Sequence, residues 1–85
     1  MNMLAAFDET IEMARARGMP LVNDSSHESE GLSLSHLIDM RRRLENDDFS
    51  EAKLGRWLGW AQGVVVAKGY GTLDEMKQIN LRNSN

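Results

Sequence analysis

The residues best suited to chemistry in this sequence are cations and indoles in its second half. Lys53, Arg56 and Trp60 recur at intervals of three and four residues, so a helix would place them along one side. Guanidinium and ammonium groups bind phosphate, and an indole stacks on a planar base. We therefore predict an anion-binding surface here, with further charge from three consecutive residues, Arg41, Arg42 and Arg43. In the alternative, the cations stay solvated, Trp57 is a core residue and Trp60 covers a seam between helices or subunits.

A stripe of glycines lies beside these residues. Gly55, Gly59 and Gly63 are spaced by four within a segment of helical apolar periodicity, and each costs a helix about 1 kcal/mol relative to alanine. Such a stripe lets another helix, a second copy of the chain or a flat ligand approach the backbone closely. Three explanations are open: tight packing inside a helical hairpin, self-association, or direct approach of a ligand. The candidate interface residues are Gly55, Trp57, Gly59, Trp60 and Gly63.

Residue types that catalyse reactions or bind metals are scarce. The chain has no cysteine and two histidines, His27 and His36, and the sequence fixes no acid–base or metal-binding geometry around either of them. The Gly-Tyr-Gly run at residues 69–71 has neither the spacing of a phosphate loop nor a strand before it. We therefore expect no catalysis, no metal and no cofactor.

Apolar periodicity and end signals predict helices at residues 3–17, 34–45, 50–68 and 73–81. Asp48 with Glu51, and Thr72 with Glu75, have the spacing of N-capping pairs for the last two helices. Residues 23–32 are polar and aperiodic, which predicts a flexible loop. No segment alternates with a period of two, so strands are not expected. The sequence predicts a single all-α domain over the whole chain, with about four helices centred on an antiparallel hairpin of residues 34–45 and 50–68.

Composition limits the partners and the compartment. The chain has 85 residues, 41% of them apolar, so its core is small and self-association would add burial. The net charge is −3, yet residues 33–85 carry eight basic and seven acidic groups, which favours an anion-binding surface in this part. A helix-turn-helix would have an apolar, glycine-rich recognition helix, so nucleic-acid binding is not expected. We expect no signal peptide and no transmembrane helix, and the lack of cysteine fits the cytosol.

Two segments, KLGRWLGWAQ at 53–62 and TLDEMKQIN at 72–80, are similar to small helical accessory proteins of tailed bacteriophages and prophages. Residues 36–66 also resemble the helical hairpin of phage anti-CBASS and anti-Thoeris sponges. The matching elements are an arginine-bearing helix and a polar turn, followed by Ser50, Ala52, Lys53, Leu54 and Trp60. The resemblance covers little more than a third of the chain, and it transfers no individual ligand residue. Those sponges sequester cyclic-nucleotide or related immune signals in helical oligomers.

The resemblance and the cation–indole pattern together give a functional hypothesis. We expect a phage-type counter-defence protein in the host cytosol that sequesters a cyclic-nucleotide or related anionic immune signal by stoichiometric binding in a homo-oligomer. The alternative is a protein–protein inhibitor or regulator of a host enzyme that docks through the helix at residues 50–68. A structural phage component is a third possibility.

Overall fold

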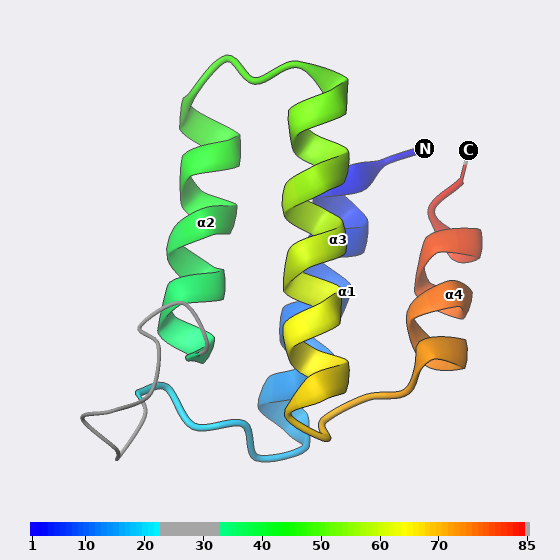
Figure 1. Cartoon of the computed structure of the whole chain (residues 1–85). Coiled ribbons are helices and arrows are strands. Elements are labelled where there is room, and N and C mark those ends of the chain that lie inside the picture. Colours follow the sequence, from blue (N-terminus) through cyan, green and yellow to red (C-terminus); the bar gives the residue numbers. More distant parts are fainter. Residues whose placement is uncertain (23–32, 85) are drawn as a thin grey trace.

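The computed structural model describes residues 1–22 and 33–84, and this part of the chain is helical without any strand. Its four helices are α1 (Met3–Ala16), α2 (Leu34–Asn46), α3 (Glu51–Ala67) and α4 (Leu73–Arg82) (Figure 1). The predicted all-α class is confirmed, and α2 and α3 form the expected antiparallel hairpin. Each helix end lies within one residue of its predicted position. The loop predicted at residues 23–32 falls outside the described residues.

Polar side chains cap the starts of the helices and satisfy backbone amides that have no partner within the helix. Thr72 and Glu75 form the predicted capping box at α4. The expectation that Asp48 caps α3 is wrong, because the N-cap residue is Ser50, whose hydroxyl accepts a hydrogen bond from the Lys53 amide at 3.2 Å. An N-cap side chain accepts from the amide two or three residues after it, so Asp48 would have capped the Glu51 amide, whereas the helix begins two residues later and Ser50 caps the Lys53 amide.

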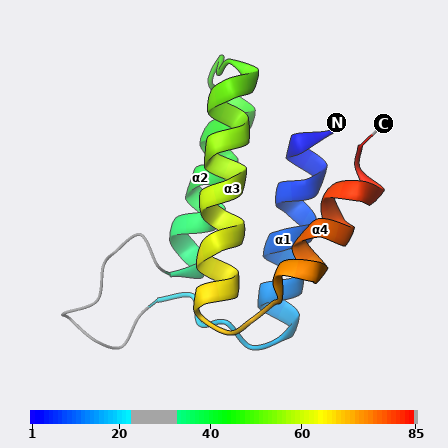
Figure 2. The ribbon, with the colours of Figure 1, turned by 45° about the vertical axis from the view of Figure 1, so that its right-hand side comes forward.

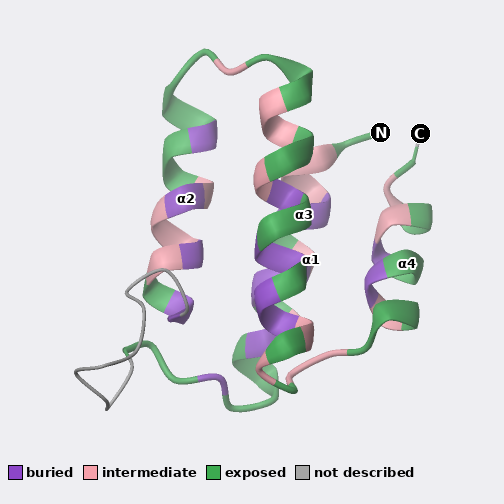
Figure 3. Ribbon diagram, viewed as in Figure 1, coloured by how far each residue is buried: buried purple, intermediate pink, exposed green. Residues whose placement is uncertain are grey.

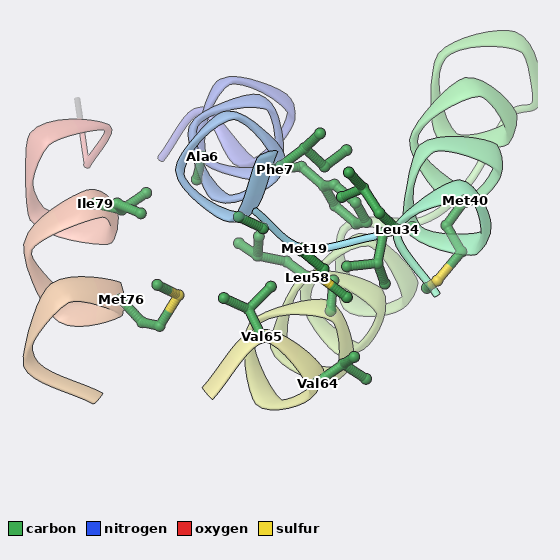
Figure 4. Close-up of a cluster of buried hydrophobic side chains, with 14 of the residues drawn as sticks. Ala6, Phe7, Met19, Leu34, Met40, Leu58, Val64, Val65, Met76 and Ile79 are labelled. Atoms are coloured by element: carbon green, nitrogen blue, oxygen red, sulfur yellow. The ribbon is translucent and has the colours of Figure 1, made fainter. Parts of the chain in front are cut away.

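The helix α1 is the element on which the other three assemble. It packs against both helices of the hairpin and against α4 (Figures 1 and 2). Its Phe7 and Ala14 are completely buried. From α4, Met76 and Ile79 point toward the same hydrophobic cluster (Figure 4). Because the hairpin and α4 are both held by α1, the sides of α3 that face away from α1 are free to form binding surfaces.

A buried polar network connects α1, α3 and α4. The Gln62 amide Nε2 donates hydrogen bonds to Thr10 Oγ1 at 3.2 Å and to Asn80 Oδ1 at 2.9 Å. Asn80 Nδ2 donates back to Gln62 Oε1 at 3.1 Å, and the Thr10 hydroxyl donates to the Ala6 carbonyl at 2.8 Å. Buried polar groups are costly unless they are paired. The network therefore fixes how α4 is seated against the other helices.

The helices are amphipathic, with buried and exposed segments alternating along each of them (Figure 3). This alternation is what a small helical bundle requires, because each helix covers the core with one side and faces solvent with the other. Within the described residues, none of the helices combines the length and the apolar character that a membrane span requires.

Candidate functional site

A groove with a volume of about 290 Å³ lies between α2 and α3. Four residues of α2 and two of α3 line it, and we call it the α2–α3 groove: His36, Asp39, Met40, Arg43, Trp57 and Trp60. The α2 residues are spaced by three, four and seven positions and the tryptophans by three, so each set lies on one side of its helix. The antiparallel hairpin brings these two sides together.

Aromatic rings form much of the groove wall. Trp60 is 43% exposed. The rings of His36 and Trp60 form a T-shaped pair, with their centroids 5.7 Å apart and their planes at 77°. Trp57 is only partly buried and packs against the Phe49 ring at 5.0 Å. Exposed indole surface is unusual in a folded chain, because it loses the stabilisation that burial would give. These rings therefore offer a stacking surface for a planar ligand.

Asp39 organises two of the predicted cations at the groove. Its Oδ1 accepts a hydrogen bond from Arg42 Nη2, and Arg43 Nε lies 3.0 Å from its Oδ2. The pKa of the Asp39 carboxyl is lowered chiefly by the hydrogen bond from Arg42, and the charges of Arg43, Arg42 and His36 lower it further. Asp39 is therefore ionised at neutral pH and pairs with both guanidinium groups, of which Arg43 lines the groove together with the indoles.

The remaining predicted arginine of α2, Arg41, does not line the groove. Its Nε lies 2.7 Å and its Nη2 3.1 Å from the two carboxylate oxygens of Asp8 on α1, and its Nη1 lies 3.4 Å from Glu45. The Arg41 side chain is only 17% exposed. A guanidinium in a two-point contact with a carboxylate is already occupied. Arg41 therefore joins α2 to α1, and we remove it from the candidate ligand-binding residues.

The two cations of α3 lie near the groove without lining it. Lys53 Nζ lies over the rings of Phe49 and Trp57, at 4.3 and 5.5 Å from their centroids, so its charge is partly stabilised by the aromatic faces. Arg56 is exposed, lies one helical turn before Trp60 and forms no ion pair within the described part of the chain. We use the word rim for Arg42, Lys53 and Arg56, the cations beside the groove that do not line it.

The glycine stripe faces away from the core. Gly55, Gly59 and Gly63 are all exposed. A methyl group added at Gly59 or Gly63 would meet no atom of the described residues within 4 Å, and one at Gly55 would approach only the Met3 sulfur, at 3.8 Å. Tight packing inside the hairpin, the first of the three explanations, is therefore wrong. Self-association and approach of a ligand remain as explanations of the stripe.

Sequence reasoning missed part of the groove. The candidate ligand-binding residues predicted from the sequence do not include His36, Asp39 or Met40, all of which line the groove. The signal that was present is their spacing, because His36, Asp39 and Arg43 share a helix side with each other. Within the described residues, no group of histidine, cysteine, aspartate or glutamate side chains is arranged to hold a metal ion.

A second, more open groove of about 520 Å³ lies along α4, and Gln62 of α3 also lines it. Its walls include three apolar side chains that are mostly exposed, Met1, Leu73 and Leu81, with Leu73 at 77%. The Gln62–Asn80 amide pair also contributes to it. We call it the α3–α4 groove. Its exposed apolar surface suits contact with another protein more than binding of an anion.

The α2–α3 groove thus combines stacking surface with the Arg43 guanidinium and the ionised Asp39 carboxylate, and the α3–α4 groove offers apolar surface. Comparison of the chain with protein-family models, curated proteins and solved structures finds no match.

Proposed function

We propose that the protein acts by stoichiometric binding, and that its α2–α3 groove holds a small planar anion of the nucleotide class. The observation that carries this proposal is the presence of two indoles and the Arg43 guanidinium in one groove. Stacking of a base on an aromatic side chain contributes about 1–3 kcal/mol. A guanidinium group binds phosphate through geometry and charge together.

The size and charge of the groove support the same ligand class. Its volume of about 290 Å³ is close to the lower end of the range for small-molecule sites, about 300–1,000 Å³. One ring system enters a groove of this size, and an attached phosphate stays at the rim. There the phosphate meets Arg43 of the groove wall and the rim cations. Asp39 is the single carboxylate among the described lining residues. This excess of positive charge favours an anion.

The resemblance to phage nucleotide sponges supports a biological setting for this binding. In that setting the protein counteracts host defence in the cytosol by sequestering a cyclic-nucleotide or related immune signal. The exposed glycine stripe supports the further proposal that the active form is a homo-oligomer, because bare helix backbone permits close contact between copies. No cofactor and no catalytic step are needed for this role.

Isothermal titration with a panel of cyclic di- and trinucleotides tests the proposal. We expect heat from at least one of them, and about tenfold weaker binding by the Arg43→Ala variant, because a charge-assisted hydrogen bond is lost. Arg15→Ala is the matched control, since Arg15 is an exposed arginine of α1 whose ion pair with Glu12 spans 3.6 Å. Equal weakening by both variants, or no heat from any nucleotide, would reject the proposal.

A second candidate function is inhibition or regulation of a host protein by docking through α3. The α3–α4 groove favours it, because Leu73 and Leu81 leave apolar surface exposed in a groove that Gln62 of α3 also lines. Capture of one host protein in a stable one-to-one complex, lost with Gly63→Leu, would support this candidate. A methyl group at Gly63 meets no described atom within 4 Å, so the backbone there accepts a side chain, and leucine blocks close approach to this side of α3.

A further inference from the structure

The carboxylate of Asp39 is the feature of the α2–α3 groove that an anion-binding site does not need. It lies on the α2 wall between His36 and Arg43, which are respectively three residues before it and four after it. A negative group in this place opposes binding of a phosphate. Its pairing with Arg42 and Arg43 leaves acceptor positions open on both oxygens, and a donor on the ligand can fill them.

We infer that Asp39 selects a ring with two adjacent N–H donors, the arrangement found on the pairing edge of guanine. This inference rests on the proposed function, because it assigns a base to the nucleotide that the groove would bind. A ring stacked against the indoles turns its edge toward the α2 wall, where it meets the carboxylate. The N1–H and the 2-amino group of guanine then donate to the two oxygens of Asp39.

The hydrogen-bonding capacity of Asp39 is sufficient for this contact. An ionised carboxylate offers about four acceptor positions. Arg42 uses one on Oδ1 and Arg43 uses one on Oδ2, so each oxygen can accept one more hydrogen bond. The Asp39 side chain is 34% exposed, so a ligand in the groove can reach it. Arg43 uses its Nε for Asp39, and its terminal nitrogens can donate to the O6 acceptor of guanine, a pairing that arginine commonly makes.

The other bases fit this wall less well. Adenine and cytosine each present an amino donor next to a ring nitrogen that accepts, so one carboxylate oxygen would face a lone pair. Uracil presents one N–H between two carbonyl acceptors. Leaving a polar group of a binding site without its partner costs more affinity than a change in apolar contact does. Guanine, with two neighbouring donors, is therefore the preferred base, and hypoxanthine, which lacks the 2-amino group, is intermediate.

Titration calorimetry with three monophosphates measures this preference: guanosine, inosine and adenosine 5′-monophosphate. The three share one phosphate and one ribose, so their contacts with the rim are the same and the differences report the base. We expect guanosine monophosphate to bind at least about tenfold more tightly than adenosine monophosphate, with inosine monophosphate between them. Cyclic dinucleotides of guanine and of adenine should follow the same order.

The Asp39→Asn variant provides the second arm. An amide donates and accepts side by side, which matches the pairing edge of adenine, so the preference should disappear or reverse. Loosening of Arg42 leaves the ratio of the two affinities unchanged, because both nucleotides carry the same phosphate. Loosening of Arg43 would weaken its contact with O6 and lower the guanine preference by itself. Arg43→Ala, which loses that contact and keeps Asp39, should therefore retain a guanine preference. Circular dichroism confirms that the variant remains helical, and if it does not, the order of the three wild-type affinities still decides.

The outcomes separate the inference from the proposed function. Binding of all three monophosphates with equal affinity, or a preference for guanine that Asp39→Asn retains, overturns the inference and leaves the groove a nucleotide site. Absence of binding by every nucleotide overturns the proposed function, and the inference with it. A guanine preference that Asp39→Asn removes supports both.

Discussion

The amide pair between Gln62 and Asn80 gives the sharpest test of how α4 is attached. Two direct hydrogen bonds join the two side chains, at 2.9 and 3.1 Å, and Gln62 is 7% exposed. A net contribution of about 0.5–1.5 kcal/mol for each bond gives an expected coupling of about 1–3 kcal/mol. The network is shared with Thr10, so truncating Gln62 also removes the bond to that hydroxyl at 3.2 Å.

A double-mutant cycle isolates the coupling. The free energy of unfolding is measured by urea denaturation for the wild type, Gln62→Ala, Asn80→Ala and the double variant. Gln78→Ala is the matched control, because Gln78 is an exposed amide on α4, the helix that also carries Asn80. This substitution should change the free energy of unfolding by no more than about 0.5 kcal/mol. A lost kcal/mol should lower the melting temperature by about 4–8 °C in a domain of this size. A coupling below about 0.5 kcal/mol would refute the assignment of the network as the attachment of α4.

Two further predictions concern stability. Gly71→Ala should destabilise the fold by about 1 kcal/mol, because a methyl group there would lie 2.9 Å from the Met76 methyl and 3.2 Å from a Val65 methyl. Gly63→Ala has open space and should stabilise α3 by up to about 1 kcal/mol. Thermal unfolding of the two variants measures both signs. The pKa of Glu75 is lowered from 4.5 to about 2, chiefly by the hydrogen bond from Arg17. Its contribution is therefore complete above pH 4.5 and is lost as the pH falls toward 2. The stability difference between wild type and Glu75→Gln should shrink over that interval in acid titrations, and a constant difference would contradict this reasoning.

Local signals in the sequence were enough to predict the helices. Apolar residues with helical spacing marked their extents, and the Thr72–Glu75 pair marked the start of α4. Glycines marked two of the ends, because Gly18 and Gly69 adopt φ values of 91° and 86° that other residues rarely adopt. All of these signals act within a few residues along the chain.

Contacts between distant residues were not predictable in this way. Arg41 pairs with Asp8, 33 positions away, and this contact rather than a ligand occupies its guanidinium. The periodicity of α1 identified an apolar side but not that three other helices would pack against it. Which partner a charged or apolar side chain meets depends on how the helices are arranged in space.

The glycine stripe illustrates the limit of a pattern on a single helix. Spacing by four places Gly55, Gly59 and Gly63 on one side, and this part of the prediction follows from helix geometry alone. The direction of that side depends on which other residues of α3 are buried. Leu58, Ala61 and Val65 face the core, so the glycines face outward. The hairpin packing explanation failed for this reason.

The central claim, that the α2–α3 groove binds a planar anion, is tested most directly by nuclear magnetic resonance of the indole N–H groups. The chain has two tryptophans, so the spectrum contains two indole signals, and Trp60→Ala assigns them. During titration with guanosine 5′-monophosphate, the signals of Trp57 and Trp60 should both shift and saturate at the same ligand concentration. Two indole signals that stay in place up to millimolar nucleotide would contradict the account.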